Sequence, residues 1–137
     1  REVALEQRTT LAREKQLVAA IGRSFALIEF DMKGHVLHAN DNFLKTLGYT
    51  LDEIKGRHHS LFCEPAYRDS ADYRAFWDRL GAGQYDAGQY KRIGKDGREV
   101  WIQASYNPVF GDDGRPERVV KLATDITAEK LRNADHE

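Results

Sequence analysis

The sequence predicts an α+β fold: one antiparallel sheet of five strands, with short helices on one face and an amphipathic helix at the N-terminal end. Two hairpin signals support the sheet. Lys95-Asp96-Gly97 separates two β-prone runs, and Asp31-Met32-Lys33-Gly34 separates two shorter ones. Between the hairpins, residues 41–80 carry helix caps and helical spacing of apolar side chains. Helices grouped apart from the strands in this way are typical of the α+β class.

The hairpin of residues 89–109 is expected to form the centre of the sheet, because Asp and Gly tolerate the positive φ that a tight turn requires. On its second strand, alternate side chains point to opposite faces. One face carries Val100, Ile102, Ala104 and Tyr106, and the other carries Trp101, Gln103, Ser105 and Asn107. The small side chain on the apolar face leaves room for a closely packed helix or for a ligand. We expect this strand to end at Asn107-Pro108.

The length and composition of the chain indicate one domain. Its 137 residues are 41% hydrophobic and 31% charged, which suits one core. A net charge of -1 gives no electrostatic basis for binding nucleic acid. The one cysteine, Cys63, excludes an intrachain disulfide and favours a reducing, cytoplasmic setting. No apolar run approaches the roughly 20 residues that span a bilayer, so we expect no membrane insertion of this segment, although its parent could be anchored elsewhere.

Residues 1–22 are predicted to form a polar helix with a narrow apolar stripe. This segment has no proline and no internal glycine. Apolar or small residues recur at intervals of seven, at Val3-Ala4, Thr10-Leu11 and Leu17-Val18. Three interpretations remain open: a coiled-coil seam that joins a parallel homodimer, a helix docked on the domain's own sheet, and a solvated linker helix.

Short elements are expected between residue 25 and the central hairpin. Strands are predicted over 25–30 and 36–39, followed by a helix that Asn40 or Asp41 caps. Thr50 and Glu53 have the spacing of a capping box for the next helix. Residues 57–67 are expected to be irregular. Ser70 then caps a helix with one aromatic face, formed by Tyr73, Phe76, Trp77 and Leu80. A last strand over 118–124 and a charged helix after Thr127 complete the predicted elements.

Taken together, these motifs resemble a PAS domain. Asp31-x-x-Gly34 with Asn40 looks like the first hairpin of that family, and Gly94-Lys95-Asp96-Gly97 followed by Trp101 looks like its third and fourth strands. Thr124-Asp125-Ile126-Thr127 is similar to the motif that ends the fold and begins the output helix. The resemblance covers residues 23–127. It implies the strand order 2-1-5-4-3, an N-terminal helix over 1–22, and a helix from 128 that leads to a downstream signalling domain of the same chain.

A narrower resemblance concerns the PAS sensor domains of bacterial chemoreceptors, in the aerotaxis and biofilm-dispersion groups. It is carried by Phe62-x-x-Pro65-x-Tyr67, by the aromatic helix, and by Ser105-Tyr106-Asn107-Pro108. Such domains are sensory inputs that detect oxygen, redox state or a small ligand. The resemblance implies a pocket between the inner face of the sheet and the helices of residues 41–80. Its predicted lining is Ala26, Ile28, Phe30, Tyr73, Trp77, Ile102, Ala104, Tyr106 and Ala123, although aromatic side chains at helical spacing are more often core.

Haem b is the first candidate cofactor that the resemblance suggests, because neutral imidazole is a good iron ligand. The helix after Ser70 has no histidine, which excludes the ligation mode of the kinase-type oxygen sensors. A second class in chemoreceptors uses a histidine in the preceding turn, where His58 or His59 could serve. We favour His59 as the iron ligand, and the alternative is a capping or surface pair. Arg57 or Arg92 could pair with propionates, but surface solvation is the expected role of both.

FAD is the alternative cofactor, and a ligand-free dimerisation or interaction module is the third possibility. Light-sensing relatives carry Gly-x-Asn-Cys where this chain reads Gly56-Arg57-His58-His59, so the reactive thiol is absent. The redox-sensing flavin type carries His-Pro where Glu64-Pro65 stands here, although Trp77, Tyr90 and Asn107 could line a flavin site. The sequence shows no catalytic triad and no phosphate-binding loop. A catalytic metal on the crowded His58, His59, Glu64 and Asp69 is improbable, and we expect no enzymatic activity.

These expectations combine into one hypothesis for signalling. A signal shifts the inner face of the sheet at Ile102, Ala104 or Tyr106, and the outer face passes the shift to the flanking helices. A ligand can act in this way only if it binds one packing arrangement better than the other. The hypothesis fails if Trp101 and Gln103 fill the interior.

Overall fold

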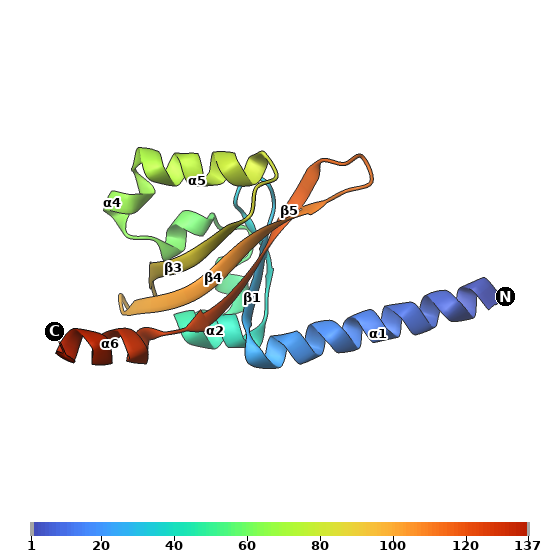
Figure 1. Ribbon diagram of the computed structural model, residues 1–137, viewed down its shortest axis with the longest axis horizontal. Helices are drawn as coiled ribbons and strands as arrows, with labels where there is room; N and C mark the ends of the chain where they lie inside the picture. The colour runs from blue at the N-terminus through green and yellow to red at the C-terminus, as the bar shows by residue number, and fades with distance from the viewer. Residues whose placement is uncertain (1, 137) are drawn as a thin grey trace.

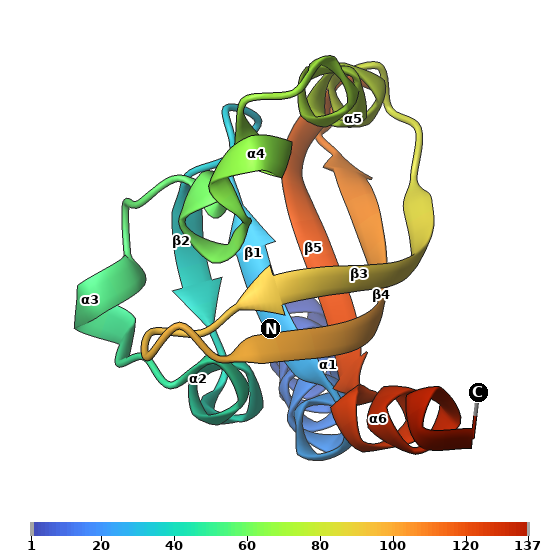
Figure 2. The ribbon, with the colours of Figure 1, turned by 90° about the vertical axis from the view of Figure 1, so that its left-hand side faces the viewer.

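The sheet has the expected topology in a computed structural model of the chain, which describes residues 2–136, with side chains through residue 134. Five antiparallel strands lie in the order β2-β1-β5-β4-β3, and this confirms the predicted fold class. The strands are β1 (Ala26–Phe30), β2 (Val36–Ala39), β3 (Asp86–Ile93), β4 (Glu99–Phe110) and β5 (Pro116–Asp125). Because β1 and β5 pair in the middle, the first and last strands of the domain are neighbours (Figure 2).

Five short helical segments cover one face of the sheet, and a helix leaves the domain at each end of the chain. The covering segments are α2 (Asp41–Leu47), α3 (Leu51–Ile54), the 3-10 turn η1 (His59–Phe62), α4 (Pro65–Arg68) and α5 (Ala71–Gly81). The terminal helices are α1 (Glu2–Ser24) and α6 (Thr127–His136). In Figure 1, α1 extends away from the domain on one side and α6 on the other.

The core lies between the covering helices and the inner face of the sheet. Ile102, Ala104 and Tyr106 are at most 4% exposed, whereas Gln103 is exposed and Trp101 half-buried. The predicted alternation along β4 is therefore confirmed. Ile28 and Phe30 of β1 and Ala123 of β5 lie on the same buried face, as expected.

β4 does not end at Asn107-Pro108, as the sequence suggested, but continues to Phe110. Pairing with β3 stops at the Asp86–Tyr106 pair, whereas pairing with β5 continues through Pro108 opposite Val119. Beyond Tyr106, β4 thus has a neighbour on one side only. A proline can stay in a strand there because one edge needs no N–H donor.

Residues 57–67, expected to be irregular, contain η1 and α4. The His58 side chain caps the start of η1 by accepting a hydrogen bond from the backbone N–H of Ser60 at 3.1 Å. Pro65 occupies the start of α4, a position that suits its fixed φ and missing N–H. Each segment has four residues, too few to produce a helical repeat of apolar side chains.

α1 packs on the domain only at its last turn. None of its residues is buried, and only Ile21 and Gly22 are half-buried, so the structure does not support docking of the whole stripe on the domain's own sheet. The other two interpretations, a coiled coil and a solvated helix, remain. No helix among residues 2–136 combines the length and apolar character needed to cross a bilayer.

Asn40 joins three elements at the base of α1. Its Oδ1 atom accepts hydrogen bonds from the backbone N–H groups of Phe43 at 3.0 Å, which caps α2, and of Leu27 in β1 at 2.9 Å. Its Nδ2 atom donates to the carbonyl of Phe25 at 3.0 Å. Of the two candidate caps, Asn40 is therefore the one used, and it also holds the α1–β1 junction.

Candidate functional site

His59 occupies the centre of the interior. It begins η1 and is 0% exposed, whereas His58 is half-buried. Two backbone contacts fix this orientation: the N–H of His59 donates to the carbonyl of Gly34 at 2.8 Å, and His58 forms a β-bridge with His35. Of the two candidate histidines, only His59 faces the inner surface of the sheet.

A chain of hydrogen bonds runs from Arg92 through Tyr106 and His59 to Tyr73. The Nη2 atom of Arg92 donates to the Tyr106 hydroxyl at 2.9 Å. The same hydroxyl lies 2.8 Å from His59 Nε2, and His59 Nδ1 lies 2.8 Å from the Tyr73 hydroxyl. A neutral imidazole has one donor and one acceptor nitrogen. Tyr106, which already accepts from Arg92, therefore donates to Nε2, and Nδ1–H donates to Tyr73.

Burial keeps His59 and the two tyrosines of this hydrogen-bond chain uncharged. Desolvation holds the pKa of His59 well below its ordinary value, and the nearby positive charges of Arg92 and Lys121 act in the same direction. Desolvation also raises the pKa of Tyr106 to about 12, an effect that Arg92 partly offsets. Protonation of His59 would place a second donor on the Tyr106 oxygen and a charge beside Arg92. The neutral arrangement is accordingly the stable one.

Two basic side chains, Arg92 and Lys121, lie inside the domain although the sequence did not place them there, and burial holds the pKa of Lys121 well below its ordinary value. Arg92 is 3% exposed and Lys121 is 1% exposed, so surface solvation was the wrong expectation for Arg92. The Lys121 Nζ atom lies 4.7 Å from the centre of the Tyr106 ring and 5.9 Å from that of Phe43. The signal for Lys121 was present: with Ala123 on the inner face of β5, the residue two positions earlier must share that face.

The predicted lining residues come together, but they pack against one another. The His59 ring has the rings of Phe30, Phe76 and Trp77 within 5.2, 6.1 and 5.5 Å, measured between ring centres. Both of its nitrogens are hydrogen-bonded, and the side chain is 0% exposed. With the interior packed in this way, a porphyrin or a flavin would have to displace these side chains.

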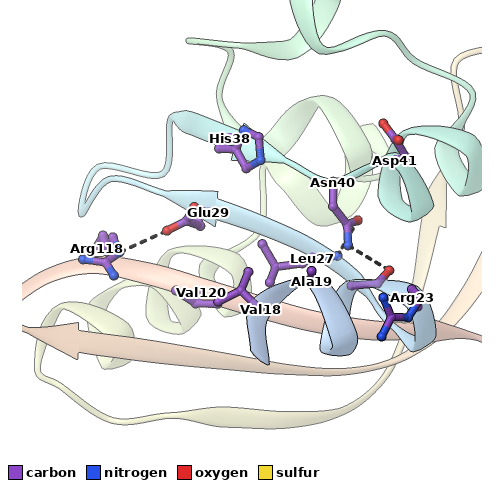
Figure 3. Close-up of a pocket in the computed structure, with 11 residues that line it drawn as sticks. Val18, Ala19, Arg23, Leu27, Glu29, His38, Asn40, Asp41, Arg118 and Val120 are labelled. Atoms are coloured by element: carbon purple, nitrogen blue, oxygen red, sulfur yellow. Dashed lines mark hydrogen bonds and ion pairs between the residues drawn. The ribbon is translucent and has the colours of Figure 1, made fainter. Parts of the chain in front are cut away.

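The outer face of the sheet, by contrast, carries an open cavity beside α1. A pocket of about 470 Å³ lies between the last turns of α1 and the outer sides of β1 and β5 (Figure 3). Val18, Leu27 and Val120 form its apolar part. Glu29 and Arg118 pair across β1 and β5 at 3.1 Å along one side. Any movement of β5 against β1 therefore changes the surface on which α1 rests.

Trp101, near the start of β4, holds the beginning of α6. The N–H of Trp101 donates to the Thr127 hydroxyl at 3.0 Å, and the Trp101 carbonyl accepts from the N–H of Ile126 at 2.8 Å. Lys130 of α6 places its ammonium group 4.8 Å from the centre of the Trp101 ring. β4 thus carries Tyr106 on its inner face and the start of α6 near its beginning.

The strand order, the helical cover and this interior define a PAS domain. The model of the PAS fold family matches residues 36–123, and the chain belongs to that family. Solved structures agree on the fold: a PAS domain from Colwellia psychrerythraea has a TM-score of 0.72 at 20% identity, covering 83% of this chain and 97% of its own. An RNA-binding light-oxygen-voltage receptor has a TM-score of 0.76 at 23% identity, covering 91% of this chain and 36% of its own.

Relatives with similar sequences include the biofilm dispersion protein BdlA of Pseudomonas aeruginosa, which is 50% identical over 108 residues, or 79% of this chain and 26% of that protein. The aerotaxis receptor of Escherichia coli is 29% identical over 101 residues, 74% of this chain and 20% of the receptor. The chain spans about a quarter or less of the length of these relatives.

Proposed function

We propose that this domain is the sensory input of a bacterial chemoreceptor-type signalling protein, as its likeness to BdlA and to the aerotaxis receptor suggests. The signal acts on the interior around His59 and Tyr106 and reaches the flanking helices through the sheet. The domain itself performs no catalysis. It works in the cytoplasm, a reducing setting that suits the free, buried thiol of Cys63. A downstream domain of the same chain receives the signal from α6.

The observation that supports this role is the buried polar chain from Arg92 to Tyr73. Polar groups cost free energy when buried without partners, and a chain in which each hydroxyl depends on its neighbour has two distinct states, intact and broken. A ligand, a proton or a redox change that breaks one bond leaves the two side chains that it joined with unpaired polar atoms in the interior. An interior of aliphatic residues alone lacks this property.

The path outward follows β4 to α6. A shift of Tyr106 moves β4, and the Trp101 backbone, on the same strand, carries the two hydrogen bonds that hold the start of α6. The path to α1 runs through β5, which pairs with β4 and also lines the pocket under α1. Both terminal helices are thus one strand away from the polar chain.

Hydrogen exchange tests this path. In Tyr106→Phe, the amides of Ile126 and Lys130 should exchange faster than in the unchanged protein, because the interior change reaches the start of α6. Tyr85→Phe removes the same hydroxyl from a side chain that is 72% exposed and should leave those amides unchanged. If faster exchange in Tyr106→Phe stays confined to the interior strands and α5, the proposed path is wrong.

The exposed stripe of α1 supports a homodimer through this helix. Val3, Leu11 and Leu17 are 63%, 51% and 62% exposed, and such a polar helix is marginal in isolation. A second copy of α1 packed along the stripe would bury these side chains. Leu11→Glu should therefore shift the protein toward monomer in sedimentation, whereas Thr9→Glu, on the opposite side of the helix, should not. Equal masses for both variants would favour the solvated helix.

Haem at His59 and FAD remain predictions, and each meets an obstacle in the structure. The buried neutral imidazole suits iron, but a porphyrin would have to break at least one of the two His59 hydrogen bonds and displace the aromatic side chains. For FAD, Cys63 is a buried thiol in the turn, outside the expected adduct position. A Soret band that is lost in His59→Ala would establish haem, and absorption near 450 nm would establish flavin. A colourless protein supports the sensory role without either cofactor, or a ligand-free interaction module.

A further inference from the structure

Arg92 and Lys121 are two buried basic side chains without an acidic partner, and of the two it is Arg92 that stays charged, because burial and the charge of Arg92 hold the pKa of Lys121 well below its ordinary value. Neither forms an ion pair within the part of the chain that the structure describes. Arg92 donates to the carbonyl of Lys91 at 3.0 Å and to the Tyr106 hydroxyl at 2.9 Å, while its Nε–H is buried and has no hydrogen-bond partner. An always-charged guanidinium with an unused donor in the interior requires an acceptor.

A small pocket leads to Arg92 between α4 and β3. It has a volume of about 270 Å³, and its lining is Glu64, Tyr67, Tyr90, Lys91 and Arg92. The rings of Tyr90 and Tyr67 cover the guanidinium, with its central carbon 5.0 and 5.9 Å from the ring centres. The carboxylate of Glu64 pairs with Lys91 at the rim and leaves Arg92 without a counter-ion. The size is slightly below the range of about 300–1,000 Å³ typical of ligand sites, which suits a small molecule.

We propose that this pocket admits a small anionic ligand, carrying a carboxylate or a phosphate group, whose charged oxygens bind the guanidinium of Arg92. The planar fork of an arginine side chain matches both groups geometrically. The charge that the anion meets is therefore that of Arg92, which also bonds the Tyr106 hydroxyl. The inference deepens the proposed function, because the anion would compete with Tyr106 for Arg92 and so act on the polar chain.

Thermal unfolding at constant ionic strength tests the site with acetate and inorganic phosphate as probes, and with acetamide as the uncharged analogue of acetate. A ligand that binds only the folded chain raises the unfolding midpoint. We expect acetate or phosphate to raise the midpoint by about 3 °C or more at ten times its dissociation constant. Acetamide should give no rise. The stronger of the two anions identifies the ligand as a carboxylate or a phosphate.

Matched variants separate the site from general charge effects. Arg92→Gln should abolish the rise, whereas Arg57→Gln, the same change on an exposed arginine, should keep it. If Arg92→Gln fails to fold, Arg92→Lys serves in its place. It keeps a positive charge but loses the planar fork that binds two oxygens at once, and it should reduce the anion-dependent rise by at least half.

The possible outcomes are distinct. The inference is overturned if neither anion shifts the unfolding midpoint of the unchanged protein, or if the full shift persists in Arg92→Gln or, where that variant does not fold, in Arg92→Lys. Hydrogen exchange at Ile126, measured with the anion bound, tests the sensory role separately. Anion binding that leaves this exchange unchanged would contradict the proposed function but keep the anion site. An absence of binding would remove the site but keep the Tyr106 path.

Discussion

The Nε2 atom of His59 lies 2.8 Å from the hydroxyl oxygen of Tyr106, and neither side chain has measurable exposure to solvent. The two residues are 47 positions apart, on η1 and β4. Their hydrogen bond is therefore the point at which the helical cover is tied to the inner face of the sheet. Because Arg92 also bonds this hydroxyl, the state of the sheet and the protonation of His59 depend on each other.

The stability of the protein should fall with acidification through His59. The pKa of the folded side chain is held well below the ordinary value of 6.5, so the unfolded chain takes up the proton first as the pH falls. Above pH 6.5 both states are neutral at this site. Below it, the free energy of unfolding should decrease by up to about 1.4 kcal/mol per pH unit until the folded pKa is reached.

His59→Gln is expected to remove this component from the pH profile of unfolding by denaturant. His38→Gln changes an exposed histidine in the same way and should retain the component. If the free energy of unfolding falls equally steeply between pH 6.5 and 5 in His59→Gln and in the unchanged protein, His59 does not titrate as its surroundings indicate.

Tyr106→Phe should destabilise the fold by about 1–3 kcal/mol, because it leaves Arg92 Nη2 and His59 Nε2 without a buried partner. Because the ring itself stays in place, the loss of stability measures the contribution of the hydroxyl group alone. Tyr85→Phe should change the free energy of unfolding by less than about 0.5 kcal/mol. A loss for Tyr106→Phe no larger than that of its control would mean that the hydrogen-bond chain carries little energy.

Gly34→Ala tests how tightly the His58 side chain packs against the backbone at Gly34. Gly34 has φ of +88°, and an added Cβ would lie 2.7 Å from His58 Nε2. Gly97 has nearly the same backbone conformation, with φ of +83°, but open space around it. Gly97→Ala should cost about 1 kcal/mol for the backbone alone. Gly34→Ala should cost clearly more in chemical denaturation, and equal losses would show that the His58 side chain moves aside freely.

Asn40→Ala should cost about 1–2 kcal/mol, since it removes the α2 cap and the bonds to β1. The amides of residues 22–25 should also exchange faster, because Asn40 donates to the carbonyl of Phe25. Asn133→Ala, an exposed asparagine on α6, is the control and should have a small effect. If the variant loses stability but the amides at the α1 junction do not exchange faster, then Asn40 only caps α2 and does not hold that junction.

Patterns of polarity predicted the sheet well because a half-buried strand repeats every two residues. The alternation of β4 and the Thr50–Glu53 capping box follow directly from local sequence. The buried positions of Arg92 and Lys121 were missed because cations are assigned to the surface by default, and their partners come from distant strands. Whether aromatic side chains line a cavity or fill it depends on packed volume, which periodicity does not measure.

The central claim is that the interior polar chain and the start of α6 are coupled through β4. A double-mutant cycle of unfolding free energies, with Tyr106→Phe and Thr127→Val, measures this coupling most directly. Distant, independent sites add within about 0.3–0.5 kcal/mol. We predict an interaction energy of at least about 0.5–1 kcal/mol. Strict additivity of the two substitutions would contradict the claim.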